Sequence, residues 1–131
     1  MVSCYDINNK DNSVLGNWKS IANEDAEKLY TEIYIDSETI NIFSEEVNEI
    51  IFSDYYKITD TEIFVLKENN GNKKDTIFNI TYLVSGNNLK LHNDKFDSNY
   101  KKIKKGYTLD EYIDGYITIE NYLNSFNERK D

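Results

Sequence analysis

The chain has 131 residues, a formal net charge of −9, one cysteine and one histidine. This length is typical of a single domain, and a single cysteine excludes an internal disulfide. Binding of nucleic acid requires a basic face, which we do not expect on so acidic a chain. No nucleic-acid partner is therefore predicted. No run is apolar over the ~20 residues that a membrane-spanning helix needs.

The first thirteen residues are polar and rich in turn-forming types after Cys4, which predicts a flexible N-terminal tether over residues 1–13. Val2-Ser3-Cys4 resembles the end of a bacterial lipoprotein signal, in which small residues precede the lipidated cysteine. A lipid on Cys4 would anchor the protein in the bacterial cell envelope, in the periplasm or on the outer surface, without a spanning helix. The alternative is an ordinary free cysteine in a cytoplasmic protein.

Short apolar runs separated by turn-forming residues follow from Val14 onward. The run from Leu29 to Ile35 alternates, with Ile33 on one face and the charged Glu32 on the other, which is typical of a half-buried strand. Proline is absent, so Asn, Asp, Ser and Gly must form the turns. The runs predict eight strands, over residues 14–22, 29–35, 39–43, 50–58, 62–66, 76–84, 89–91 and 99–104.

Eight short strands at regular spacing predict a mainly β fold, an antiparallel meander that closes into a roughly eight-stranded barrel. The predicted barrel domain covers residues 14–131, including a C-terminal helix. An open sheet and a two-sheet sandwich remain alternatives, since periodicity does not distinguish them.

Gly16-Asn17-Trp18 on the first predicted strand resembles the signature of lipocalins and of bacterial lipocalin-like lipoproteins. The resemblance implies that Trp18 closes the base of the barrel against a basic residue of the last strand. Lys101 or Lys102 is the counterpart here, where the family usually has arginine. The later segments that share the resemblance are Tyr56-Lys57-Ile58, Ile80-Thr81-Tyr82-Leu83, Gly86-Asn87-Asn88-Leu89-Lys90-Leu91 and Tyr100-Lys101-Lys102-Ile103.

The resemblance also implies a barrel interior that, in many members, binds a small apolar molecule. A barrel of eight strands is just wide enough for its own side chains or for one small ligand. A packed core therefore stands as an equal alternative to a ligand site. The candidate lining residues are Ile33, Ile35, Phe52, Tyr56, Phe78, Ile80 and Tyr82.

After Gly106 the apolar residues recur at helical spacing, which predicts an amphipathic C-terminal helix over residues 108–128. Thr108 and Glu111 have the spacing of a capping box. Gly115 weakens a continuous helix, so two helices broken near residues 115–118 are the alternative. We expect the apolar stripe to pack on the barrel wall. It consists of Leu109, Tyr112, Tyr116, Ile119, Leu123 and Phe126.

Acidic residues are concentrated between Glu24 and Glu62, where twelve of them stand against two lysines. Such a flank can attract a basic partner. The alternative function is therefore a protein-interaction module, an inhibitor or immunity-type protein that neutralises a basic protein, with Glu45, Glu46 and Glu49 in the contact. A solvated face is the simpler interpretation.

The sequence offers little for catalysis. His92 is the only histidine and lies among Asn93 and Asp94, where a solvated surface position is expected. No metal site built on His and Cys is predicted, and there is no phosphate-binding loop motif. We therefore expect a protein without enzyme activity, cofactor or metal, whose partner is a small apolar molecule or a basic protein.

Overall fold

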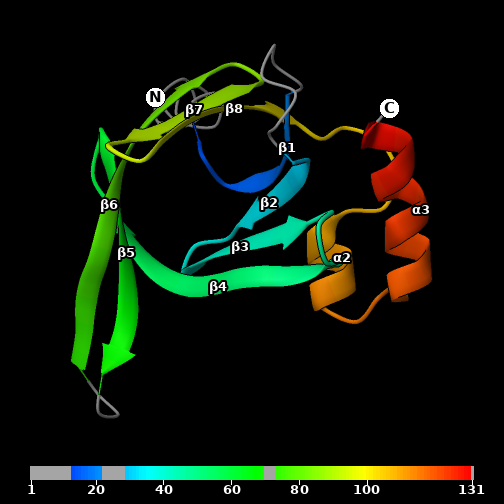
Figure 1. The fold of residues 1–131 in the computed structure, drawn as a ribbon, viewed down its shortest axis with the longest axis horizontal. Helices are drawn as coiled ribbons and strands as arrows, with labels where there is room; N and C mark the ends of the chain where they lie inside the picture. Colours follow the sequence, from blue (N-terminus) through cyan, green and yellow to red (C-terminus); the bar gives the residue numbers. More distant parts are fainter. Residues whose placement is uncertain (1–12, 22–28, 70–72, 131) are drawn as a thin grey trace, which may run out of the picture.

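The computed structural model describes residues 13–21, 29–69 and 73–130. Within these, eight strands form a closed antiparallel barrel in which each strand pairs with its neighbours in sequence and β1 pairs with β8 (Figure 1). The predicted fold class and strand number are confirmed. The strands are β1 (Gly16–Ser20), β2 (Thr31–Ile35), β3 (Thr39–Ser44), β4 (Glu49–Ile58), β5 (Glu62–Asn69), β6 (Lys73–Ser85), β7 (Asn88–Asn93) and β8 (Phe96–Lys102).

Several strands are longer than their apolar patterns predicted, most clearly β5, β6 and β7. The hydrophobic run of β6 begins at Thr76, but its pairing with β5 continues to Lys73. Backbone pairing needs no apolar side chain, so a ladder can continue past the hydrophobic run. The β5–β6 hairpin extends away from the rest of the molecule, and the C-terminal helices lie on the opposite side (Figure 1).

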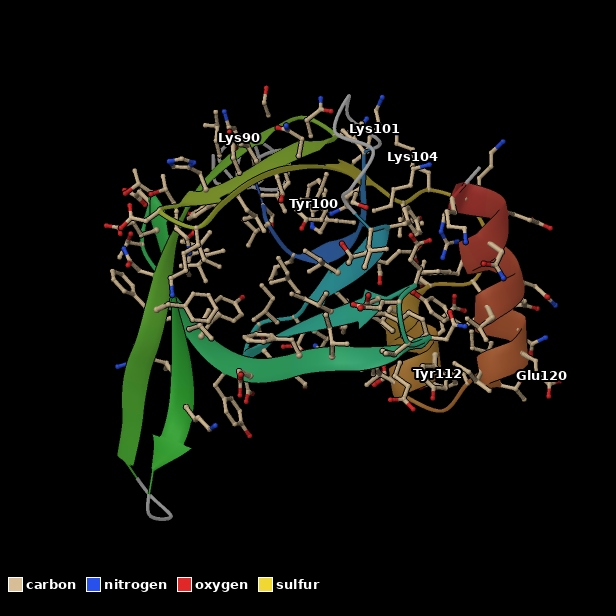
Figure 2. All side chains as sticks on the ribbon, in the orientation of Figure 1. Lys90, Tyr100, Lys101, Lys104, Tyr112 and Glu120 are labelled. Atoms are coloured by element: carbon tan, nitrogen blue, oxygen red, sulfur yellow. The ribbon has the colours of Figure 1, made fainter. Side chains whose placement is uncertain are left out.

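The inner faces of the strands form a single apolar core. Figure 2 shows Tyr100 pointing from β8 toward the inside, whereas Lys90, Lys101 and Lys104 project outward. Each fully buried Ile or Leu of this core contributes about 1.5–3 kcal/mol of transfer free energy. The buried members are Val14, Trp18, Ile33, Ile35, Ile40, Tyr56, Ile63, Val65, Ile80, Leu89, Leu91 and Tyr100.

The C-terminal segment forms two helices, α2 (Leu109–Ile113) and α3 (Ile119–Lys130), where a single helix over 108–128 was predicted. The chain leaves α2 through Gly115, whose φ of +83° is a left-handed conformation that favours glycine. The break removes Tyr116 from the apolar stripe, and its side chain is 81% exposed. The alternative of two helices is therefore the observed one.

The start of α2 has the predicted capping box, in which the Thr108 backbone N–H donates to Glu111 Oε1 at 3.0 Å. Both helices pack on the outer face of β2 and β3 through a second apolar cluster. Phe43 lies at its centre, with ring centroids 4.9 Å from Tyr122 and 5.2 Å from Phe126. Such edge-to-face contacts add stability beyond the buried area.

Candidate functional site

All seven predicted lining residues face the barrel interior and belong to one cluster with Trp18. The periodicity of their strands did not fix the faces of Phe52, Tyr56 and Tyr82, and all three pack with this cluster. The seven residues differ in how far their side chains are buried. Ile33, Ile35, Tyr56 and Ile80 are buried, whereas Phe52, Phe78 and Tyr82 are only partly buried.

Phe52 on β4 and Phe78 on β6 form an aromatic pair on the inner face of the barrel, over the intervening strand β5, with ring centroids 6.0 Å apart and planes inclined by 59°. Between them Val65 of β5 is fully buried. The two rings are inward-facing but still contact solvent. Together with Tyr82, they are the most solvent-exposed of the seven predicted lining residues.

The hydroxyl groups of Tyr56 and Tyr82 are already satisfied by the protein. Tyr56 donates to the carbonyl oxygen of Asp36 and Tyr82 to that of Thr59, both at 2.6 Å. Burial raises the pKa of both phenols, so they are neutral near pH 7. Both carbonyls belong to turns at one end of the barrel. The two hydrogen bonds therefore hold these turns against the strands that carry the tyrosines. An interior ligand would be recognised there by shape and apolar contact.

The base of the barrel is closed by Trp18, whose side chain is fully buried. Lys102 places its Nζ 4.6 Å from the centroid of the Trp18 ring and donates to the Leu15 carbonyl at 2.6 Å. Trp18 Nε1 donates to the Val14 carbonyl at 2.9 Å. Of the two predicted counterparts, Lys102 is thus the one that contacts the tryptophan. Burial lowers the pKa of Lys102.

The backbone conformation at the base favours glycine at position 16. The φ of Gly16 is +122°, which residues with a side chain rarely adopt. A Cβ at this position would lie 2.6 Å from Lys102 Nζ, but this atom is the far end of a flexible side chain, so the backbone conformation is the main constraint. The glycine of the Gly-x-Trp pattern therefore has a physical basis here.

The three predicted interaction glutamates have different environments. Glu45 accepts a hydrogen bond from the Tyr30 backbone N–H at 3.1 Å and lies 3.2 Å from Lys130 Nζ, so it is part of the fold. Hydrogen bonding from Tyr30 and the Lys130 charge lower its pKa, with burial acting in the opposite direction. Glu46 and Glu49 are exposed. Of the three, these two are available to a partner.

Glu32 was assigned to the charged face of its strand, but it is fully buried beneath α3. Arg129 binds its carboxylate through Nε and Nη2, both at 2.8 Å, and the hydroxyls of Tyr122 and Tyr30 also donate to it. Arg129 is the only arginine in a chain with fourteen lysines. A guanidinium binds a carboxylate with two parallel bonds, which lysine does not. The single arginine is therefore the sequence feature that could have indicated a buried carboxylate partner.

His92 is exposed, and its Nδ1 lies 3.9 Å from Asp97. Among the described residues, no three His, Cys, Asp or Glu side chains are grouped closely enough to hold a metal ion. No helix in the described part of the chain is long and apolar enough to cross a membrane. Cys4 and residues 1–12 of the predicted tether lie outside the described residues.

Comparison of the chain with protein-family models, with curated proteins and with solved structures finds no match.

Proposed function

We propose that this protein is a lipocalin-like barrel that binds a small apolar molecule in its interior. The proposal rests mainly on the aromatic pair of Phe52 and Phe78, which face inward and yet contact solvent. Partly exposed rings on an inner face are apolar surface that a ligand can cover. An apolar ligand that contacts the two rings from the barrel interior would complete their burial, at roughly 25 cal/mol per Å² of apolar area removed from water.

One end of the barrel is tied by protein contacts, so we expect an apolar molecule to enter at the other. Trp18, Lys102 and the hydroxyls of Tyr56 and Tyr82 all make contacts toward the first end. In an antiparallel meander the β3–β4 turn lies at the opposite end. Val47 in that turn is 51% exposed.

The proposal extends to the cell envelope, with a lipid on Cys4 as the anchor. Its support is the sequence Val2-Ser3-Cys4 followed by a polar stretch. Radiolabelled palmitate incorporated by bacteria that express the protein from its natural gene would test the anchor, with Cys4→Ser as the control. No incorporation into the wild-type protein would contradict it.

Ligand binding is best tested by titrating the purified protein with a fluorescent fatty-acid analogue. We expect saturable binding that the variant Phe52→Trp weakens, because the larger ring takes up space beside Phe78 on the inner face of the barrel. Leu83→Trp is the matched control, since Leu83 is on the outer face of β6 and 64% exposed. Both variants must show the wild-type circular dichroism spectrum and melting temperature.

Two results would contradict the interior site. One is the absence of saturable binding, together with native mass spectra that show the purified protein without a bound molecule. The other is equal weakening by Phe52→Trp and Leu83→Trp. The variant Phe52→Ala gives an independent check, because it enlarges the same space and should change the affinity while Leu83→Ala does not.

The second candidate is an interaction module for a basic protein, favoured by the exposed Glu46 and Glu49 beside the exposed Val47 in the β3–β4 turn. Salt-sensitive binding of a basic test protein such as lysozyme to the immobilised domain would support it. The variant Glu46→Lys/Glu49→Lys should abolish that binding, and Glu38→Lys/Asp60→Lys, of equal charge change, should preserve most of it. Glu45 is unsuitable for charge reversal because it is bonded within the fold.

A further inference from the structure

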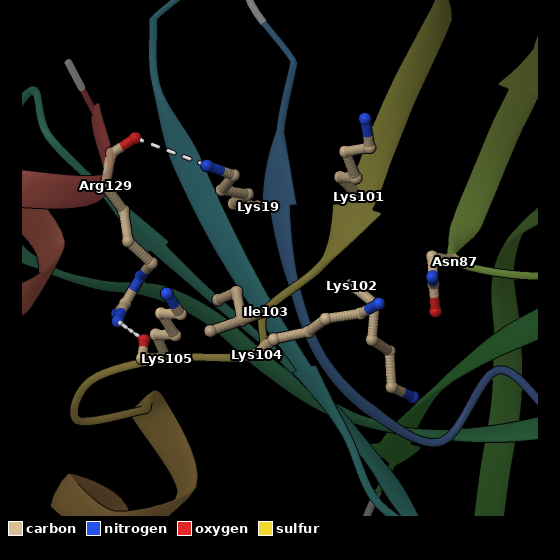
Figure 3. A pocket seen from close by; sticks show the side chains of 8 residues that line it. All are labelled: Lys19, Asn87, Lys101, Lys102, Ile103, Lys104, Lys105 and Arg129. Atoms are coloured by element: carbon tan, nitrogen blue, oxygen red, sulfur yellow. Dashed lines mark hydrogen bonds between the residues drawn. The ribbon is translucent and has the colours of Figure 1, made fainter.

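Five lysines and the single arginine line a pocket of about 390 Å³ in this otherwise acidic protein (Figure 3). The pocket lies beside β1 and β8, the segment that follows β8, and the last turn of α3. Its volume is within the range of about 300–1,000 Å³ that small-molecule sites occupy. The lining residues are Lys19, Asn87, Lys101, Lys102, Ile103, Lys104, Lys105 and Arg129.

The barrel closure places two of these lysines directly opposite each other. Lys19 of β1 and Lys101 of β8 are register partners in the pair of strands that closes the barrel. Like charges at opposed positions of a sheet destabilise it. Lys104 and Lys105 follow immediately and line the same pocket. The positive charge is therefore concentrated at the seam of the barrel.

Two of the cations are already used by the fold. Arg129 binds Glu32, and its Nη1 donates to the Lys105 carbonyl at 2.9 Å, which connects α3 to the segment after β8. Lys102 covers Trp18. These contacts hold the pocket wall in place.

The other four lysines make no ion pair with the described residues. Within the described part of the chain, no salt bridge joins Lys19, Lys101, Lys104 or Lys105 to a carboxylate. Lys19 Nζ makes a long contact of 3.5 Å with the Arg129 carbonyl. Lys101, Lys104 and Lys105 are exposed. The four side chains line the pocket from different sides, and their ammonium groups point in different directions (Figure 3). Their combined charge favours an anion with more than one negative charge.

We propose that this pocket binds a phosphate-bearing small molecule, at a site separate from the barrel interior. Flexible ammonium groups act as point charges that suit phosphate oxygens. The pocket exceeds the size of a single phosphate ion, so a diphosphate or an organic phosphate ester fits it better. The net charge of −9 repels anions at long range. Binding of phosphate compounds by this protein therefore requires a local site.

The test is calorimetric titration of the full chain with sodium pyrophosphate at low ionic strength. We expect saturable binding to one site per chain. The variant Lys101→Gln/Lys104→Gln should weaken it by at least about tenfold, because charge-assisted hydrogen bonds of this kind each contribute roughly that factor. Lys57→Gln/Lys67→Gln is the matched control, since it changes the net charge equally at exposed positions of β4 and β5 outside the pocket. It should bind like the wild type.

A second experiment distinguishes a soluble phosphate compound from a phosphate-bearing lipid headgroup. Co-sedimentation with phosphatidylcholine vesicles, with and without phosphatidic acid, is measured for the same three proteins. Binding of pyrophosphate assigns the pocket to a soluble phosphate compound. Binding only to vesicles that contain phosphatidic acid, lost in Lys101→Gln/Lys104→Gln, assigns it to a lipid headgroup. Either result supports the phosphate site.

Two outcomes overturn the proposal: no binding of pyrophosphate or phosphatidic acid, and equal loss of binding in both double variants. If Lys101→Gln/Lys104→Gln fails to fold, Lys105→Gln replaces it. The thermal shift of the wild type with pyrophosphate then provides a second readout, because a ligand of the native state raises the melting temperature. No shift would also overturn the proposal.

Discussion

The guanidinium of Arg129 makes two hydrogen bonds of 2.8 Å with the fully buried carboxylate of Glu32, which is 97 residues earlier in the chain. The contact joins the last turn of α3 to the outer face of β2. Burial opposes the charge on Arg129, but the hydrogen bonds and the charge of Glu32 raise its pKa. The helix is therefore held on the barrel by a paired charge as well as by its apolar face.

Removing one partner of this pair should be costly. We expect Arg129→Met to lower the free energy of unfolding by about 3 kcal/mol, because it leaves the Glu32 carboxylate buried without its cation. The double variant Glu32→Leu/Arg129→Met should recover much of the loss, since replacing both charges by apolar groups is often nearly neutral. Urea unfolding measures both. If the double variant is less stable than Arg129→Met, the explanation by an unpaired buried charge is wrong.

The two tyrosines that donate to Glu32 should make the protein sensitive to alkali. Burial and the nearby Glu32 charge raise the pKa values of Tyr30 and Tyr122 above the ordinary value. A phenol whose pKa is raised by folding stabilises the protein below the unfolded pKa of ~10 and loses that contribution as pH rises above it. Urea unfolding at increasing pH above ~10 should show falling stability. Tyr122→Phe should reduce this slope, whereas Tyr116→Phe, at an exposed tyrosine, should not.

The contact between Lys102 and Trp18 predicts a difference between two substitutions. Lys102→Met removes the cation over the ring and should cost about 0.5–2 kcal/mol of unfolding free energy. Lys102→Arg should retain most of that stability, because a guanidinium also stacks on indole. Tryptophan fluorescence reports the site directly, since Trp18 is the only tryptophan. Equal stability of the two variants would show that the cation contributes nothing.

Asp36 should contribute to stability in a defined pH range. Burial opposes its charge, but hydrogen bonds from Thr39 and the Glu38 backbone lower its pKa. A lowered pKa stabilises the fold above the unfolded value of ~3.9, and the contribution is lost as pH falls below it. Asp36→Asn should therefore be less stable than the wild type at neutral pH, and the difference should shrink in acid. Chemical unfolding of both proteins at several pH values checks this, and a constant difference would contradict it.

The barrel itself was predictable because strand alternation and turn residues are local properties of the chain. The alternation of Ile33 with its neighbours identified the inner face, and Gly16 with Trp18 indicated the base. Inner positions are mainly apolar, so the alternation along each strand indicates which of its faces is buried. The capping box at Thr108 is local for the same reason, since its members are three residues apart.

What only the tertiary structure decided depends on residues far apart in the chain. Glu32 has the pattern of a solvent-facing charge until α3 covers it and Arg129 pairs with it. The overall charge of −9 concealed the basic pocket, because Lys19 and Lys101 are 82 positions apart and meet only when β1 pairs with β8. Composition and periodicity carry no information on such distances. Closure of the barrel and docking of the helix bring these charges together.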